Sequence, residues 1–121
     1  MTIPSRVLGA GASALSTVAI CGDGVDDLTA TGSTQATALQ LTHVYNSVDV
    51  TPSGSGVRLP PTEMGAVIYI ANSGAHALLV YAYEASTTIN QNPSASVARD
   101  HVSIFFAVAL NKWYGVAGAK A

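Results

Sequence analysis

The sequence predicts an all-β fold, a small β-sandwich, jelly-roll-like or β-tripod module that carries an extended N-terminal arm. From Gly56 onward, short apolar runs alternate with turn-forming residues such as those at 60–61 and 72–74. Short strands at this spacing are typical of sandwiches and jelly rolls. Residues 1–34 differ, because they are rich in Gly, Ala, Ser and Thr and show no sustained hydrophobic period. We therefore divide the chain into an irregular N-terminal arm, residues 1–34, and a β-sandwich body, residues 35–121.

The first half of the chain gives the weaker signals. Residues 18–21 fit one short strand, and residues 22–33 have the glycine-rich, acidic composition of a loop. Residues 35–41 fit the start of a helix or a strand equally well. Residues 42–50 are predicted to be β, because valines recur there at even-numbered positions. A loop containing Pro and Gly follows, at residues 51–56.

The second half predicts strands throughout. Residues 67–71 and 77–83 are expected to pair as a β-hairpin around a turn that contains Asn, Ser and Gly. Both faces of both strands are apolar, whereas a lone small sandwich buries only one face of each sheet. The second face is therefore predicted to contact another copy of the chain or a different protein. We find no convincing internal repeat. The candidate strands are residues 56–60, 65–71, 76–83, 87–90, 95–99, 101–109 and 112–116.

The composition favours a protein that associates with others. The chain of 121 residues is long enough for one domain with a core, and hydrophobic residues make up 49% of it. Charged residues make up only 10%, against about 25% in ordinary soluble domains. Large, weakly charged surface patches are therefore expected, and such patches usually mark association surfaces. In the strand 101–109, alternate residues from Val102 to Val108 form one continuous apolar face.

Charge, hydropathy and cysteine content exclude several classes. The net charge is −2, and the five scattered basic residues do not form the basic stripe of a nucleic-acid-binding protein. No apolar run approaches the roughly 18 residues of a membrane-spanning helix. Cys21 is the only cysteine, which excludes an internal disulfide. Because Ile20 precedes it, a buried free thiol is favoured over a lipoprotein cleavage site.

Two local patterns imitate binding sites. Residues 9–14 match the dinucleotide-binding pattern G-x-G-x-x-A, but no βαβ unit surrounds them, so an arm of small residues is the preferred interpretation. Asp23, Asp26 and Asp27 lack the alternating ligands and the distal Glu of a calcium loop. A solvated acidic loop is preferred there, with a weak cation site as the alternative.

The histidines do not form a recognisable catalytic pattern. His43, His76 and His101 are isolated in the sequence, without the spacing of paired metal ligands, and no nucleophile elbow is present. We therefore expect no enzyme, no cofactor, no metal ion and no small-molecule substrate.

Several phrases of the sequence together resemble a known group of proteins. They are the arm MTIPSRVLGAGASALSTVAICGDG, the following LTATGSTQATALQLTHVYNSV, then GVRLPP, IANSGAHALLVYAY, TTIN and a last strand that closes on Trp113. This succession resembles the small virion structural proteins of tailed bacteriophages, which look like β-sandwich or β-tripod modules and act as capsid decoration (cement) proteins, usually as trimers. The resemblance implies a homotrimer that binds the major capsid protein on the capsid exterior, after assembly in the host cytoplasm. Similar modules occur in head fibres and tail spikes, so a receptor- or glycan-binding module that uses exposed aromatics such as Tyr45, Tyr83 or Trp113 is the alternative.

Interface residues are expected among the arm side chains and the aromatic and arginine residues of the body. Aromatic residues and Arg are enriched in protein interfaces. The residues predicted at a subunit or capsid interface are Ile3, Arg6, Val7, Leu8, Arg58, Tyr69, Tyr81, Tyr83 and Trp113.

Overall fold

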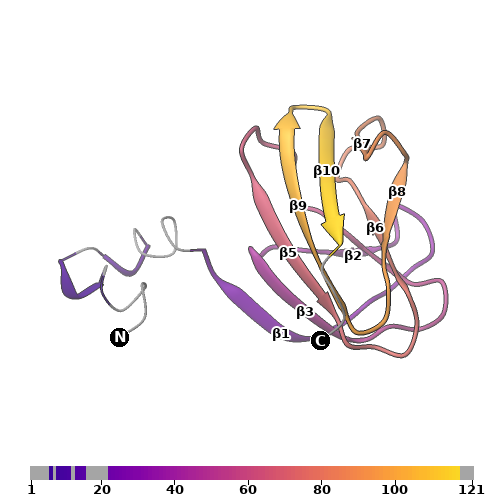
Figure 1. The fold of residues 1–121 in the computed structure, drawn as a ribbon, viewed down its shortest axis with the longest axis horizontal. Coiled ribbons are helices and arrows are strands. Elements are labelled where there is room, and N and C mark those ends of the chain that lie inside the picture. The colour runs from indigo at the N-terminus through magenta and orange to yellow at the C-terminus, as the bar shows by residue number, and fades with distance from the viewer. Residues whose placement is uncertain (1–5, 7, 12, 16–21, 118–121) are drawn as a thin grey trace.

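The protein is all-β, as predicted, and its strands form two sheets that face each other across one core (Figure 1). This computed structural model describes residues 6, 8–11, 13–15 and 22–117. All candidate strands from residue 56 onward are confirmed, residues 101–109 with their predicted bounds and the others with shifted ends. The strands are β1 (Gly24–Thr29), β2 (Leu39–Gln40), β3 (Tyr45–Val50), β4 (Gly56–Arg58), β5 (Val67–Asn72), β6 (Leu78–Tyr81), β7 (Thr88–Ile89), β8 (Ser94–Val97), β9 (His101–Ala109) and β10 (Lys112–Ala117).

The chain winds as a short β-solenoid. Sheet A has the order β1-β3-β5-β9-β10-β7, and sheet B has the order β2-β4-β6-β8. The chain passes alternately between them, so that β1 with β2, β3 with β4, and β5 with β6 each make one coil, and successive coils stack in parallel in both sheets. β8 and the β9–β10 pair then add antiparallel to the last coil. The expected sandwich, jelly-roll or β-tripod connectivity is therefore wrong, because every connection from β1 to β9 sends the chain into the opposite sheet, and only β9 and β10 are joined by a reversal within one sheet.

The coils are a structural repeat that the sequence did not reveal. Leu39 of β2 lies beside Val57 of β4, and Val57 lies beside Val80 of β6. Val57 and Val80 are fully buried, and Leu39 packs against the same core. The shared property of these positions is an apolar side chain at the inner surface of sheet B, and it recurs at unequal spacing because the corners between strands differ in length.

Residues 72–77 form a corner between the sheets, so the predicted hairpin of residues 67–71 and 77–83 is wrong. β5 belongs to sheet A and β6 to sheet B. Asn72, which is 1% exposed, holds this corner. Its Oδ1 accepts hydrogen bonds from Thr51 Oγ1 (2.7 Å) and the Gly74 amide (3.0 Å), and its Nδ2 donates to the carbonyls of His76 (2.8 Å) and Val97 (3.0 Å).

The body begins earlier than residue 35, and the loop predicted over residues 22–33 is wrong. β1 pairs with β3 in sheet A, and Ala30 just after it is 1% exposed and part of the core. The ambiguous residues 35–41 contain the strand β2, and the predicted β structure of residues 42–50 is confirmed by β3. The short strand predicted at residues 18–21 lies outside the described residues.

A hydrogen-bonded chain connects β10 with two loops near the end of the solenoid. Trp113 is 1% exposed, and its Nε1 donates to Thr62 Oγ1 (2.9 Å). The hydroxyl and amide of Thr62 donate to the carboxylate of Glu84 (2.7 and 3.1 Å), which also accepts from Thr87 Oγ1 (3.2 Å). Burial alone raises the pKa of Glu84, but these hydrogen bonds to its charged form outweigh it, so that the pKa lies below the usual value of 4.5.

Candidate interaction surface

The side of sheet A that faces away from the core is apolar and open to solvent. Along β9, Ser103, Phe105 and Ala107 point into the core. The intervening Ile104 and Phe106 are 38% and 36% exposed. Strand residues alternate between faces, so β9 places bulky apolar side chains on both sides of the sheet.

The neighbouring strands extend this apolar surface, because their outward residues align with those of β9. Tyr69 of β5 and Val116 of β10 lie on either side of Ile104, while Val67 and Tyr114 flank Phe106. We call this surface the outward face of sheet A. It consists of Tyr45, Val67, Tyr69, Ala71, Val102, Ile104, Phe106, Val108, Tyr114 and Val116.

An open groove of about 550 Å³ lies at the β1 side of the outward face. The rings of Tyr45 and Tyr69 stack in it with their centroids 4.8 Å apart and their planes at 24°. Tyr45 is 44% exposed. The groove therefore combines an aromatic wall with polar groups at its β1 end. It is lined by Gly24, Val25, Asp26, Tyr45, Asn46, Ser47, Tyr69, Ala71 and Val102.

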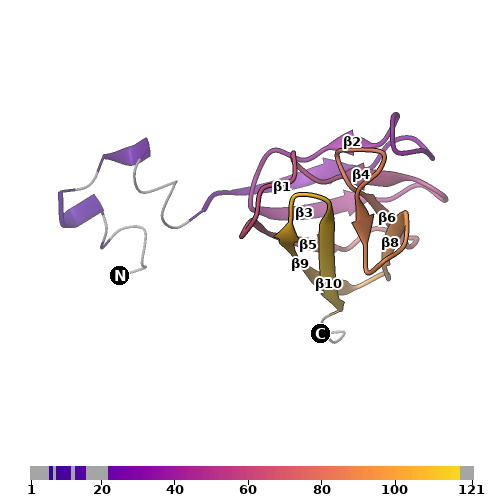
Figure 2. The same cartoon turned by 90° about the horizontal axis from the view of Figure 1, so that it is seen from above.

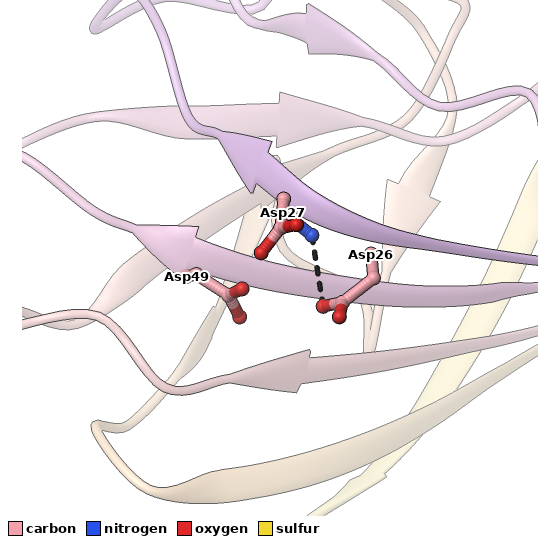
Figure 3. A group of neighbouring side chains, drawn as sticks. All are labelled: Asp26, Asp27 and Asp49. Atoms are coloured by element: carbon pink, nitrogen blue, oxygen red, sulfur yellow. Dashed lines mark hydrogen bonds between the residues drawn. The ribbon is translucent and has the colours of Figure 1, made fainter.

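An acidic group lies beside this groove, on β1 and β3 (Figure 3). Oxygen atoms of Asp26, Asp27 and Asp49 all lie within 4.8 Å of one another. Hydrogen bonding to Asp49 and repulsion by Asp26 and Asp49 raise the pKa of Asp27, whereas hydrogen bonds, first that of the Ser73 hydroxyl, lower the pKa of Asp49. Asp23, which lies close to Asp26 and Asp27 in the sequence, places its Oδ2 3.7 Å from His43 Nε2 instead.

The same acidic residues distort the edge strand β1. Asp27 has a φ of 57°, and the register of β1 against β3 shifts between Val25 and Leu28. Bulges and charges on an edge strand hinder its pairing with another chain. The outward face of sheet A is therefore a better contact surface than the β1 edge.

The outward side of sheet B is polar and internally bonded. Gln40, Arg58 and Tyr81 lie side by side across β2, β4 and β6. Arg58 Nε donates to Gln40 Oε1 (2.6 Å), and its guanidinium lies 4.9 Å from the ring centroid of Tyr83. The Tyr81 hydroxyl donates to the Ser33 carbonyl (3.1 Å). Three residues predicted at an interface therefore contact other residues of their own chain: Arg58, Tyr81 and Tyr83.

The described residues 6, 8–11 and 13–15, which we now call the arm, lie away from both sheets, beyond the start of β1 (Figures 1 and 2). Arg6, Leu8 and Leu15 are exposed, the two leucines to 47% and 86%. The amide of Ala10 donates to the Arg6 carbonyl and that of Gly11 to the Leu8 carbonyl, both at 3.0 Å, as in helical turns. The predicted interface residues Ile3 and Val7, like Cys21, lie outside the described residues.

Part of this surface is predicted by the sequence. Tyr69 lies on the outward face as a predicted interface residue, and the predicted second apolar face of residues 67–71 is present. Trp113 is buried, so its use as an exposed aromatic is wrong. Ile104 and Phe106 were recognised in the sequence as part of one continuous apolar face of residues 101–109, but they were not among the predicted interface residues. Asp49 was also missed, because it joins Asp26 and Asp27 only through the stacking of β3 on β1.

The other patterns singled out in the sequence stay separate in space. His43 bonds to Thr42 Oγ1 (3.0 Å), His76 to the Thr51 carbonyl (3.1 Å) and His101 to the Arg99 carbonyl (2.8 Å). The glycines of the dinucleotide-like pattern lie in the exposed arm, and the described strands are not joined by helices. Among the described residues, no helix has the length and hydropathy needed to cross a membrane.

Comparison with protein families, curated proteins and solved structures finds no match to this chain. Its function must therefore be argued from its own residues.

Proposed function

We propose that this chain is a virion structural protein of a tailed bacteriophage, a homotrimeric decoration protein that binds and stabilises the major capsid shell. The observation that carries the proposal is the outward face of sheet A. A continuous apolar face of this kind is uncommon on a monomer and usually marks a contact with another protein. The sequence resemblance to decoration proteins supplies the virion context.

A trimer suits a surface of this kind. Cyclic trimers use two different patches of each subunit, so one apolar face and one separate element are sufficient to close the ring. Three copies held together then bind several shell subunits at once, and weak individual contacts combine into high avidity. A decoration protein that acts by clamping needs no catalytic group.

The first test is the solution mass of the purified full chain, by light scattering after size exclusion. A particle of about three times 12.3 kDa supports the trimer, and a monomer at high concentration contradicts it. The second test is co-sedimentation with shells of the major capsid protein encoded in the same genome. Ile104→Asp is expected to weaken binding or assembly, whereas Leu110→Asp, at an equally apolar site in the β9–β10 turn that is 70% exposed, is the matched control.

The groove favours a second candidate function, glycan or receptor binding in a head fibre or tail spike. The exposed Tyr45, stacked on Tyr69, offers a ring for sugar stacking, and Asp26 and Ser47 offer polar groups beside it. A glycan array with the wild-type chain and Tyr45→Ala distinguishes the two functions. Hits that disappear in Tyr45→Ala, together with no binding to shells, favour this candidate over the decoration protein.

A further inference from the structure

We propose that the N-terminal arm of one copy, through its described residues 6, 8–11 and 13–15, lies in the groove of sheet A of a neighbouring copy. The proposal deepens the proposed function and rests on its trimer. The occupant of the groove is a second copy of this chain, and the acidic group beside the groove receives Arg6 of the incoming arm.

Apolar side chains on the arm and in the groove are both left exposed by their own protomer. Leu15 is 86% exposed and Leu8 is 47% exposed, and Figures 1 and 2 place the arm clear of the sheets. The groove presents Tyr45, Tyr69 and Val102 to solvent over about 550 Å³. Burying exposed leucine side chains against apolar and aromatic groups stabilises a contact, so the arm and the groove are both more stable when they are in contact.

Charge makes the pairing specific. Arg6 is the only charged side chain in residues 1–22. The groove ends at Asp26, beside Asp27 and Asp49. Within the described part of the chain, the ion pairs join Asp23 to His43 and Asp100 to Arg99, so no cation pairs with this acidic group. A guanidinium placed there relieves the repulsion among the three carboxyl groups, and its planar set of N–H donors makes Arg a good partner for carboxylates.

The direction of the chain favours exchange between copies. The arm leads into Gly24, the first residue of β1, and lies on the side of the body beyond that residue in both views (Figures 1 and 2). The groove runs the other way, from β1 across β3 and β5 to Val102 on β9. An arm that points outward reaches a neighbour without reversing, and in a closed ring of three each copy gives one arm and receives one.

The decisive experiment is photo-cross-linking in a mixed-isotope trimer of the full chain. A ¹⁴N chain that carries p-benzoylphenylalanine in place of Leu15 is refolded with an excess of unmodified ¹⁵N chain, irradiated and digested for mass spectrometry. The expected products join the ¹⁴N arm to ¹⁵N peptides of β3, β5 or β9. Products confined to ¹⁴N–¹⁴N pairs mean that the arm folds onto its own body, and they overturn the proposal. The same label in place of Met64, which is 70% exposed in the β4–β5 connection, is the control and is expected to give no groove products.

A charge-swap series tests the role of Arg6 independently. Arg6→Glu is expected to raise the trimer dissociation constant about tenfold or more, as for an interface residue whose loss costs over about 1.4 kcal/mol. Combining it with Asp26→Lys, on the exposed edge strand, is expected to restore association. Failure of the double variant to recover, although circular dichroism shows it folded, contradicts the assignment of the acidic group.

The outcomes separate this inference from the proposed function. A stable trimer whose arm cross-links nowhere in the groove overturns the inference and leaves the trimer standing. A monomeric chain overturns both. A trimer with exchanged arms that does not bind shells supports the inference and contradicts the decoration function.

Discussion

The two faces of β9 are equally apolar in sequence, yet the protomer buries only one of them. Phe105 points inward and is 2% exposed, whereas its neighbour Phe106 points outward and is 36% exposed. The difference lies in what stands opposite each face: sheet B covers the first, and the second has no cover within the described part of the chain. An apolar strand face therefore indicates that another surface covers it, and the fold determines whether that surface comes from the same chain.

The largest difference between the two faces is expected in folding stability. Phe105→Ala leaves a cavity beside Gly115, where the ring is so close that a Cβ built on this glycine would lie 2.6 Å from it. We expect a loss of about 3–5 kcal/mol in the free energy of unfolding, measured by urea denaturation. The matched variant Phe106→Ala is expected to cost about 1 kcal/mol or less in dilute monomer.

The stability losses of the two variants are expected to depend differently on protein concentration. Assembly that binds only the folded chain stabilises it by mass action. The loss caused by Phe106→Ala should therefore grow as the wild-type chain assembles, whereas the loss caused by Phe105→Ala is present at every concentration. Equal losses for the two variants in dilute solution would contradict the assignment of the faces.

A somewhat smaller effect is expected at the corner between β5 and β6. Asn72→Ala removes the partner of Thr51 Oγ1, the Gly74 amide and the Val97 carbonyl, which are bonded away from solvent, and of the His76 carbonyl, whose bond is partly buried. Leaving such groups unpaired costs about 1–3 kcal/mol each before water re-enters, so a net loss of about 2–4 kcal/mol is expected. Urea denaturation checks it, with Asn111→Ala in the exposed β9–β10 turn as the control. A loss no larger than that of the control would show that this corner is held by packing alone.

The sequence predicts the strands well and their connections poorly. Alternation and turn residues locate β4 to β10, because both depend on neighbouring residues. Whether the chain at Asn72 reverses within one sheet or crosses to another depends on buried hydrogen bonds that Asn72 accepts from Thr51 and donates to Val97, both distant in sequence. β1 was missed because Asp26 and Asp27 give a strand the composition of a loop.

The residues of the candidate surface also fall into those that the sequence predicts and those that it does not. Tyr69 is predictable, because both faces of its strand are apolar. The joining of Asp26 with Asp49 depends on parallel stacking of coils, which a sequence without an obvious repeat does not show. The residues predicted on sheet B, such as Arg58, find partners in their own chain.

The pH dependence of stability is also expected to differ between carboxyl groups that are linked to the core and those that face outward. Glu84 is surrounded by donors from Thr62 and Thr87, and its folded-state pKa lies below 4.5. Its contribution to stability is therefore fully present above about pH 4.5 and is lost as the pH falls through the lowered folded-state pKa. Glu84→Gln should remove part of the acid-side loss of stability, followed by urea denaturation between pH 7 and pH 3. An unchanged slope in this variant would show that Glu84 does not contribute to the acid sensitivity.

The smallest effect is expected among the outward carboxyl groups, where neighbours repel instead of donating. Asp27 has a raised pKa because it hydrogen-bonds to Asp49 and is repelled by Asp26 and Asp49. Asp49→Ala removes that hydrogen bond and one negative charge, so the pKa of Asp27 should fall toward 3.8, measured by NMR titration of the carboxyl carbons. Asp23→Ala, which removes a carboxylate paired with His43, is the control and should leave Asp27 unchanged. If the pKa of Asp27 falls equally in both variants, the three outward carboxyl groups respond to overall charge and not to their mutual contact, and the charge that we assign to the groove is diffuse.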